Sequence, residues 1–325
     1  MRRDQAGLRE ELMAGDASTV AADDLDLGPF DLDAVVAGLR QSRDVLHNVR
    51  YRGPVRPPPS RAAIEAMLGQ IARGLFPAHY GQLERRDGAA PTPEKIDAYV
   101  GAELAEALAA LDDHLRRTLP FTDPEPRPQA DVERRARKIV RAFAGKLPEI
   151  RGLLVSDLRA AYAGDPAATG YPEMSAVLHY RLAHALHRLE ARFLARQIAE
   201  IAHSLTGIDI HPGAEIAGSF FIDHGTGVVI GETAVIGERV RLYQAVTLGA
   251  RSFPADETGS LIKGRLRHPI VEDDVVIYAG ATILGRVTIG RGSTIGGGVW
   301  LTESVPPKSR ITQAETREER YDRQG

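Results

Sequence analysis

Cysteine is absent from the 325 residues of this sequence. Its absence excludes disulfide bonds, thiolate nucleophiles and metal sites built on cysteine. Basic residues are not in excess, because the formal net charge is −3, so we expect no nucleic-acid partner. The sequence contains no apolar run long enough to cross a bilayer, and its first residues lack the apolar segment of a secretory signal. We therefore expect a cytoplasmic protein with no membrane partner.

Small aliphatic residues recur at every sixth position between Ile208 and Pro307. A six-residue period fits neither an α-helix nor a two-faced strand. It is typical of a hexapeptide parallel β-helix, in which each side of a triangular coil takes one hexad. The period breaks between Leu248 and Val275, so we expect one excursion from the coil there. The positions expected to stack inside the coil are Ile230, Ile236, Leu242, Leu248, Ile277, Ile283, Ile289, Ile295 and Leu301.

The remaining sequence predicts an α+β protein in which an all-helical domain precedes the β-helix. We expect an accessory N-terminal arm over residues 1–59, with a helix near 32–48, and the helical domain over residues 60–205. The β-helix is expected over residues 206–305, followed by a charged C-terminal tail over 306–325 that Pro306 and Pro307 separate from the coil.

Capping residues and helical spacing place the predicted helices. Ser60 is expected to cap one helix and Pro93 to open another. Two helices are expected across 130–146 and 148–163, and one long helix from Pro172 to about Ser204 that Gly207 ends. The histidines of this last helix are expected to pack or to face solvent rather than to act in catalysis; they are His179, His184, His187 and His203.

Charged side chains that suit acyl transfer gather in short motifs. His224 lies among small residues in the segment Asp223–Gly227, and Asp209 precedes it by 15 residues, about one coil. A carboxylate that accepts the imidazole N–H fixes the tautomer and stabilises the imidazolium, which is what deprotonation of a hydroxyl requires. The spacing alone fits a structural Asp–His pair equally well. Arg267 suits a substrate carboxylate or a salt bridge that anchors a loop.

In their order and spacing over residues 150–307, these motifs resemble the serine O-acetyltransferases, which are acetyl-CoA-dependent members of the hexapeptide acyltransferase superfamily. The matching segments are GDP at 164–166, YRLAH at 180–184, GIDIHPGAEI at 207–216, IDHGTGVVIGETAVIG at 222–237, QAVTLGA at 244–250, RHPIVED at 267–273 and AGATILG at 279–285.

The resemblance implies acetyl transfer from acetyl-CoA to the hydroxyl of L-serine, the first step of cysteine biosynthesis. His224 would be the general base and Asp209 its partner. Asp165 and Asp223 would bind the substrate ammonium and Arg267 its carboxylate, while His268 would position the substrate. The pantetheine channel would be lined at Ala250, Ala279 and Ala281.

The resemblance also implies a left-handed β-helix and a homotrimer, or a dimer of trimers, with each active site between subunits. No metal is expected. The sequence departs from the better-known short forms in the longer excursion after Gly249 and resembles a longer bacterial and protist subgroup. Tails that insert into the sulfhydrylase, the next enzyme of cysteine synthesis, typically end in isoleucine, whereas this sequence ends in Gly325. A complex with that enzyme is therefore not expected.

Three other functions remain open on the sequence alone. The same fold and histidine base would serve an acyltransferase for another amino acid or a sugar. His211, His224 and His268 suggest a zinc hydratase, although the close histidine pair of that family is missing. A β-helix assembly protein without activity would not need this set of charged groups.

Overall fold

The computed structural model describes residues 31–50, 57–81, 91–123, 127–164, 172–251 and 265–313, with only the backbone for 43–50 and 172–174. By its contacts the chain divides into two compact units, Met1–Val55 and Arg56–Gly325. In the first unit the structure describes helix α2 (Leu32–Arg50), where a helix is predicted. The Asp31 side chain accepts a hydrogen bond from the Ala34 N–H (3.1 Å) and so begins this helix.

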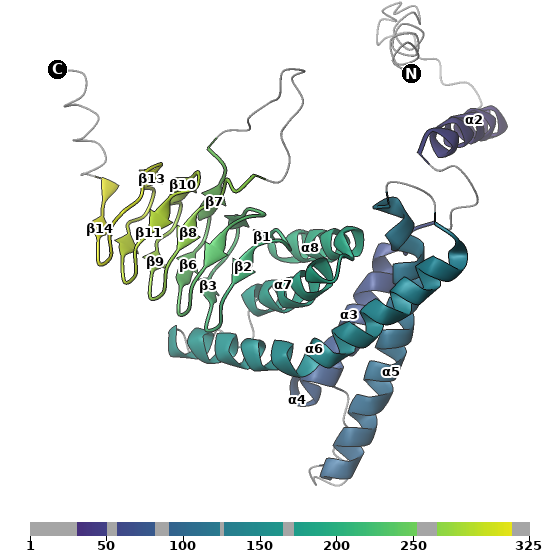
Figure 1. Cartoon of the computed structure of the whole chain (residues 1–325), viewed down its shortest axis with the longest axis horizontal. Helices are drawn as coiled ribbons and strands as arrows, with labels where there is room; N and C mark the ends of the chain where they lie inside the picture. The colour runs from purple at the N-terminus through teal and green to yellow at the C-terminus, as the bar shows by residue number, and fades with distance from the viewer. Residues whose placement is uncertain are drawn as a thin grey trace, which may run out of the picture. The chain divides into compact units, whose positions relative to one another are not determined.

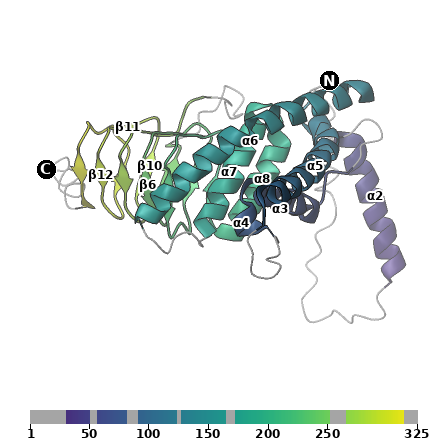
Figure 2. The ribbon, with the colours of Figure 1, turned by 90° about the horizontal axis from the view of Figure 1, so that it is seen from below.

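The second unit starts with helices and continues as a β-helix (Figures 1 and 2). Ser60 caps the first of these helices as predicted, because its hydroxyl accepts a hydrogen bond from the Ala63 N–H (3.2 Å). No helix within the described residues has the length and apolarity to span a membrane. The helical elements are α3 (Arg61–Leu75), α4 (Pro77–Tyr80), α5 (Pro93–Thr118), η2 (Leu119–Phe121), α6 (Gln129–Gly164), α7 (Pro172–Arg188) and α8 (Arg192–Thr206).

Two predicted helix boundaries are wrong. Helix α6 runs through Pro148 where two helices are predicted. Proline removes one helical hydrogen bond, but a buried stripe that includes Phe143, Leu147, Ile150 and Leu154 continues on both sides of it and holds the helix together. Conversely, the predicted long helix is the hairpin α7–α8, which breaks where Glu190 adopts a φ of 63°. Neither glycine nor proline marks this turn in the sequence.

The β-helix follows Gly207, whose φ of 70° ends α8 as predicted. Its strands form three parallel sheets, in the orders β1-β4-β7-β10-β13, β2-β5-β8-β11 and β3-β6-β9-β12-β14. The strands are β1 (Asp209–Ile210), β2 (Glu215–Ile216), β3 (Phe221–Asp223), β4 (Val229–Ile230), β5 (Val235–Ile236), β6 (Arg241–Tyr243), β7 (Thr247–Gly249), β8 (Ile270–Val271), β9 (Val276–Ile277), β10 (Thr282–Leu284), β11 (Thr288–Ile289), β12 (Thr294–Ile295), β13 (Trp300–Leu301) and β14 (Arg310–Ile311).

The register of the strands confirms the hexapeptide fold and the excursion. Val229 pairs with Thr247, 18 residues later, as three hexads require, whereas Thr247 pairs with Thr282 across the excursion. The coil extends beyond the predicted stop at Pro306 and Pro307, because β14 pairs with β12. These prolines lie at a corner of the coil between two strands. Proline is tolerated there because no backbone N–H is required for a hydrogen bond between strands.

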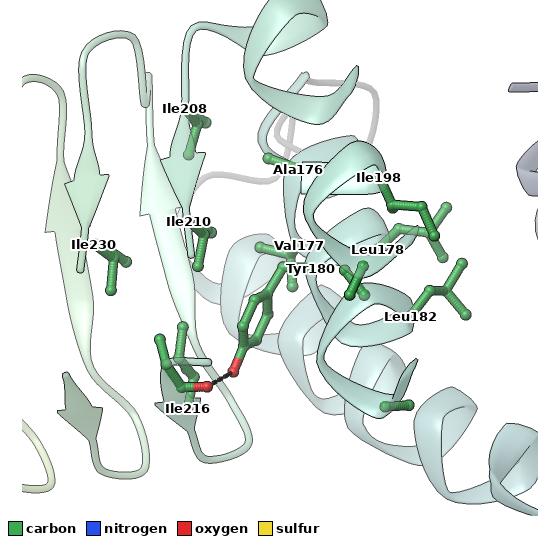
Figure 3. Close-up of a cluster of buried hydrophobic side chains, with 14 of the residues drawn as sticks. Ala176, Val177, Leu178, Tyr180, Leu182, Ile198, Ile208, Ile210, Ile216 and Ile230 are labelled. Carbon is green, nitrogen blue, oxygen red and sulfur yellow. Dashed lines mark hydrogen bonds between the residues drawn. The ribbon is translucent and has the colours of Figure 1, made fainter. Parts of the chain in front are cut away.

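The helical region closes the open end of the β-helix. Glu215 and Ala217 donate their N–H groups to the second coil, whereas the carbonyl groups of Ala214 and Ile216 face α7. Side chains of α7 take the place of the missing coil: Tyr180 Oη donates to Ala214 (2.7 Å), Arg181 donates to Ile216 and to Ala217 (2.6 Å), and His184 Nδ1 donates to Pro212 (2.9 Å). Figure 3 shows Tyr180 beside the aliphatic core of the first coils. The YRLAH segment is therefore an end cap of the β-helix.

A buried ion pair holds this cap to α6. Arg181 contacts both carboxylate oxygens of Asp157 (3.0 and 3.1 Å), and Asp157 also accepts the N–H of Phe220 (2.9 Å). The two charged residues are 4% and 0% exposed. One hydrophobic cluster continues from α3 through α7 and α8 into the coils. The predicted division of the second unit into a helical domain and a β-helix domain stays a prediction.

We predict that Asp157→Asn lowers the free energy of unfolding by about 3–5 kcal/mol, because it leaves the buried Arg181 charge without its partner. Chemical denaturation followed by circular dichroism measures the change. The matched control is Asp274→Asn, which removes a carboxylate from the exposed pair with Arg239 (2.6 Å) and should change stability far less. Equal effects of the two substitutions would contradict the role given to the buried pair.

Candidate functional site

Four of the residues predicted to carry chemistry, Asp223, His224, Arg267 and His268, lie at two corners of the coil. We call residues 223–228, between β3 and β4, the His224 corner. Residues 231–234 and 265–269, which precede β5 and β8, form the His268 corner. The two-residue strand β4 separates one corner from the other.

The His224 corner presents its histidine to solvent. The His224 side chain is 71% exposed, and its Nε2 lies 3.8 Å from Asp223 Oδ1. Asp209 pairs with Val229, 20 residues later, so the first coil is two residues longer than three hexads. The two extra residues lie in the His224 corner and make this turn wider than the others. His224 has a φ of 59°, which Arg239 and Ala245 at other corners share. Its backbone conformation therefore belongs to the coil and is no sign of catalytic strain.

Asp209 begins β1, next to the His224 corner, because the Gly227 N–H donates to the Gly207 carbonyl (2.8 Å). Its Oδ1 lies 3.5 Å from a terminal nitrogen of Arg196. The hydrogen bond predicted between Asp209 and His224 is not among the contacts of the described residues. The pairing therefore stays a prediction.

The His268 corner holds its imidazole firmly. The Thr233 N–H and hydroxyl lie 3.0 and 2.9 Å from Nδ1 of the His268 ring, which is 6% exposed. Gly231 makes room for the ring, because a Cβ atom there would lie 2.0 Å from its Cδ2. Burial lowers the pKa of His268 to about 4; the positive charges of Arg267 and Arg286 and the neighbouring His211 add to this shift, and Glu232 opposes it. The ring is therefore neutral at physiological pH.

Arg267 forms an ion pair with Glu232 (3.1 Å) at the same corner. Both side chains are partly exposed, so the pair is open to solvent and to a ligand. The sequence allowed Arg267 either to anchor a loop or to bind a carboxylate. The ion pair is consistent with the first purpose, and the binding of a carboxylate stays a prediction.

The other predicted residues are dispersed. Asp165 lies outside the described residues, and Ala250 stands where the excursion begins. Ala279 lies in a turn of the same column of corners as His224, since the next residue, Gly280, donates to the Gln244 carbonyl. The side chain of Ala281 is fully buried, and its N–H and C=O are used within the coil. The Ala281 side chain therefore belongs to the core of the coil and does not line a channel within this chain.

The histidines do not assemble as a zinc site would require. No group of three suitable side chains capable of holding a metal ion occurs among the described residues. His211 Nδ1 accepts the Gly213 N–H (3.0 Å), and burial lowers the pKa of His211. Its ring packs edge-on against His187.

Three residues in or beside the His268 corner were not among those predicted. Glu232, Thr233 and Arg286 all contact the Arg267–His268 segment. The sequence contains one indication of these contacts: Glu232 and Thr233 are two adjacent polar residues at a corner between hexads. Polar side chains at such a position need hydrogen-bond partners.

Among the described residues, the predicted groups lie in two places within one chain. His224 and Asp223 stand at one end of β4, whereas Arg267 and His268 stand at the other.

The comparisons with known proteins agree with the fold and the motifs. The family model for the bacterial transferase hexapeptide (six repeats) matches residues 268–303. The protein named "Serine acetyltransferase, plasmid" from Synechococcus elongatus is 51% identical over 309 residues. The match covers 91% of this chain and 95% of that protein. A serine acetyltransferase of Mycobacterium tuberculosis is 48% identical over 162 residues, 48% of this chain and 67% of that protein.

Solved structures give the same result. Serine acetyltransferase 1 of Entamoeba histolytica in complex with L-cysteine is 35% identical, with a TM-score of 0.64 over 81% of this chain and 90% of that one. Isoform 3 from the same organism, in complex with cysteine, is 32% identical, with a TM-score of 0.59 over 86% of this chain and 90% of that one. This chain is thus a transferase that belongs to the serine acetyltransferase family of hexapeptide-repeat proteins.

Proposed function

We propose that this protein transfers the acetyl group of acetyl-CoA to the hydroxyl of L-serine, giving O-acetyl-L-serine and CoA. The observation that carries the proposal is the 51% identity with the Synechococcus enzyme over 91% of the chain. The Entamoeba enzyme of known structure binds L-cysteine, an amino acid of nearly the same shape as serine. This supports an amino-acid acceptor over a sugar.

His224 is the general base of the proposed reaction. It takes the proton of the serine hydroxyl as the hydroxyl oxygen attacks the thioester carbonyl, and it gives the proton to the departing CoA thiolate. Asp209 orients the imidazole and stabilises its charged form. The exposure of the His224 ring supports this role, because an acceptor reaches it without rearrangement of the coil.

Arg267, Asp165 and Asp223 discriminate between acceptors. A zwitterionic amino acid needs a cation for its carboxylate and anions for its ammonium group, and these residues supply both. Ala250 and Ala279 mark the expected path of the pantetheine arm, where small residues leave room for it.

The active site is shared between subunits of a homotrimer. The separation of the His224 and His268 corners within one chain supports this arrangement, because a neighbouring subunit can bring its His268 corner to the first subunit's His224. Packing of three β-helix prisms also buries flat faces that a single prism exposes.

A direct assay tests the function. The release of free thiol from acetyl-CoA is followed with L-serine, other amino acids and sugars as acceptors. We expect serine to give the highest kcat/KM. Turnover on another acceptor with none on serine would replace the proposal with the alternative acyltransferase.

We predict that His224→Ala lowers kcat by about 10²–10⁴-fold, as expected for the loss of a general base. Asp209→Asn should be milder, because asparagine still orients the ring. His203→Ala, which removes a half-exposed histidine from α8, is the matched control and should leave kcat unchanged. Near-normal turnover by a folded His224→Ala protein would exclude the assigned role.

We predict that Arg267→Ala weakens the binding of serine by about 2–4 kcal/mol, because a charged hydrogen bond to the substrate carboxylate is lost. The KM of acetyl-CoA should change much less. Arg239→Ala is the control, since Arg239 lies at a different corner, paired with Asp274. Equal losses of apparent affinity for both substrates would show that Arg267 only holds the loop.

We predict that subunit exchange between inactive His224→Ala and inactive His268→Ala proteins restores activity. A mixed trimer contains some sites in which both residues are intact, one from each chain. Size-exclusion chromatography with light scattering measures the oligomer, and affinity tags prove the exchange. Absence of recovered activity after proven exchange, or a fully active monomer, would contradict the shared site.

A further inference from the structure

Thr233 is the hydrogen-bonding centre of the segment where the excursion returns to the coil. Its hydroxyl oxygen accepts the N–H groups of Arg267 (3.0 Å) and His268 (3.2 Å). These two donors occupy the two acceptor positions of a hydroxyl oxygen. The remaining hydroxyl proton is therefore available only for donation, and the acceptor within reach is His268 Nδ1 (2.9 Å).

These contacts determine which nitrogen of His268 carries the proton. Nδ1 accepts from the Thr233 N–H (3.0 Å) and faces the Thr233 hydroxyl, so it has no room for a proton of its own. The proton of the neutral ring is therefore on Nε2. A ring in this state donates a hydrogen bond through Nε2 and cannot accept one there.

We propose that Thr233 is a positioning residue that holds Arg267 and His268 in place and keeps His268 as a neutral Nε2–H donor toward an oxygen of the bound substrate. The proposal rests on the proposed function in one respect: the substrate whose oxygen is bound is taken to be serine or the acetyl group it receives. It assigns His268 to hydrogen-bond donation and leaves base catalysis to His224 alone.

Other contacts make the same segment rigid. One terminal nitrogen of Arg286 donates to the carbonyl oxygens of Thr233 (2.6 Å) and His268 (3.0 Å), which ties the second coil to the returning chain. Burial of the ring, together with Arg267, Arg286 and His211, lowers the pKa of His268 to about 4 against the opposing effect of Glu232. The ring therefore stays neutral through the pH range in which a serine hydroxyl is acetylated by a histidine base.

The tautomer is measured without any activity. The full-length protein, labelled with ¹⁵N at its histidine rings, gives long-range ¹⁵N–¹H spectra at neutral pH, and the signals lost in a His268→Gln variant belong to His268. We expect a protonated Nε2 and an unprotonated Nδ1. A proton on Nδ1, or on both nitrogens, would overturn the proposal.

Substitution tests the positioning. Thr233→Val keeps the size and the backbone N–H but removes the hydroxyl, and it should lower kcat/KM for serine by about 10–100-fold through misplacement of Arg267 and His268. The KM for acetyl-CoA should stay near the wild-type value. Thr233→Ser restores the hydroxyl and should restore most of the activity. Unchanged kcat/KM in Thr233→Val, or a Thr233→Ser protein as impaired as Thr233→Val, would overturn the proposal.

Thr294→Val is the matched control for loss of a threonine from the coil. Thr294 lies in β12, and within the described part of the chain its hydroxyl makes no hydrogen bond. A similar loss of activity in Thr294→Val would show that the effect of Thr233→Val comes from a general disturbance of the coil, and not from loss of the contacts to Arg267 and His268. If Thr233→Val does not fold, the proposal is still tested by the ¹⁵N–¹H spectrum of the wild-type protein and by the activity of Thr233→Ser. If the wild-type protein shows no activity with serine, the proposed function fails, and the spectrum alone decides whether His268 has the inferred tautomer.

Discussion

The contact between α7 and the first coil is the constraint on which the second unit depends. Each coil of the β-helix directs carbonyl groups toward the coil that precedes it. No coil precedes the first one, so its outward carbonyl groups need other donors. Tyr180, Arg181 and His184 satisfy these carbonyl groups, and the buried Asp157 compensates the charge of Arg181. An unpaired carbonyl group or charge buried at this junction would destabilise the fold. The helical region and the β-helix therefore share one core.

The same rigid coil separates the groups of the candidate site. Each coil turns at fixed corners, so residues at different corners stay apart whatever their side chains do. His224 stands at one corner and the Thr233–His268 network at another. The His224 side chain is exposed to solvent, whereas the His268 ring is buried and hydrogen-bonded to Thr233. In the proposed function, a neighbouring subunit brings its His268 corner to the first subunit's His224.

Much of this fold follows from the sequence, because the hexapeptide period leaves little choice of structure. Tertiary contacts decided the features that the sequence did not predict. The buried stripe around Pro148 overrides the proline, and Glu190 turns the chain without a glycine. The candidate residues were found through their motifs, but the roles of Thr233 and Arg286 depend on contacts between residues 34 and 53 positions apart. No local pattern reveals such contacts.

The central claim is that one serine is bound by two chains. A crystal structure of the assembled protein with L-serine tests it most directly. The account predicts that the serine hydroxyl lies within hydrogen-bond distance of His224 of one subunit while its carboxylate contacts Arg267 of the neighbouring subunit. A serine held by His224 and Arg267 of the same chain, or one bound away from both corners, would contradict the account.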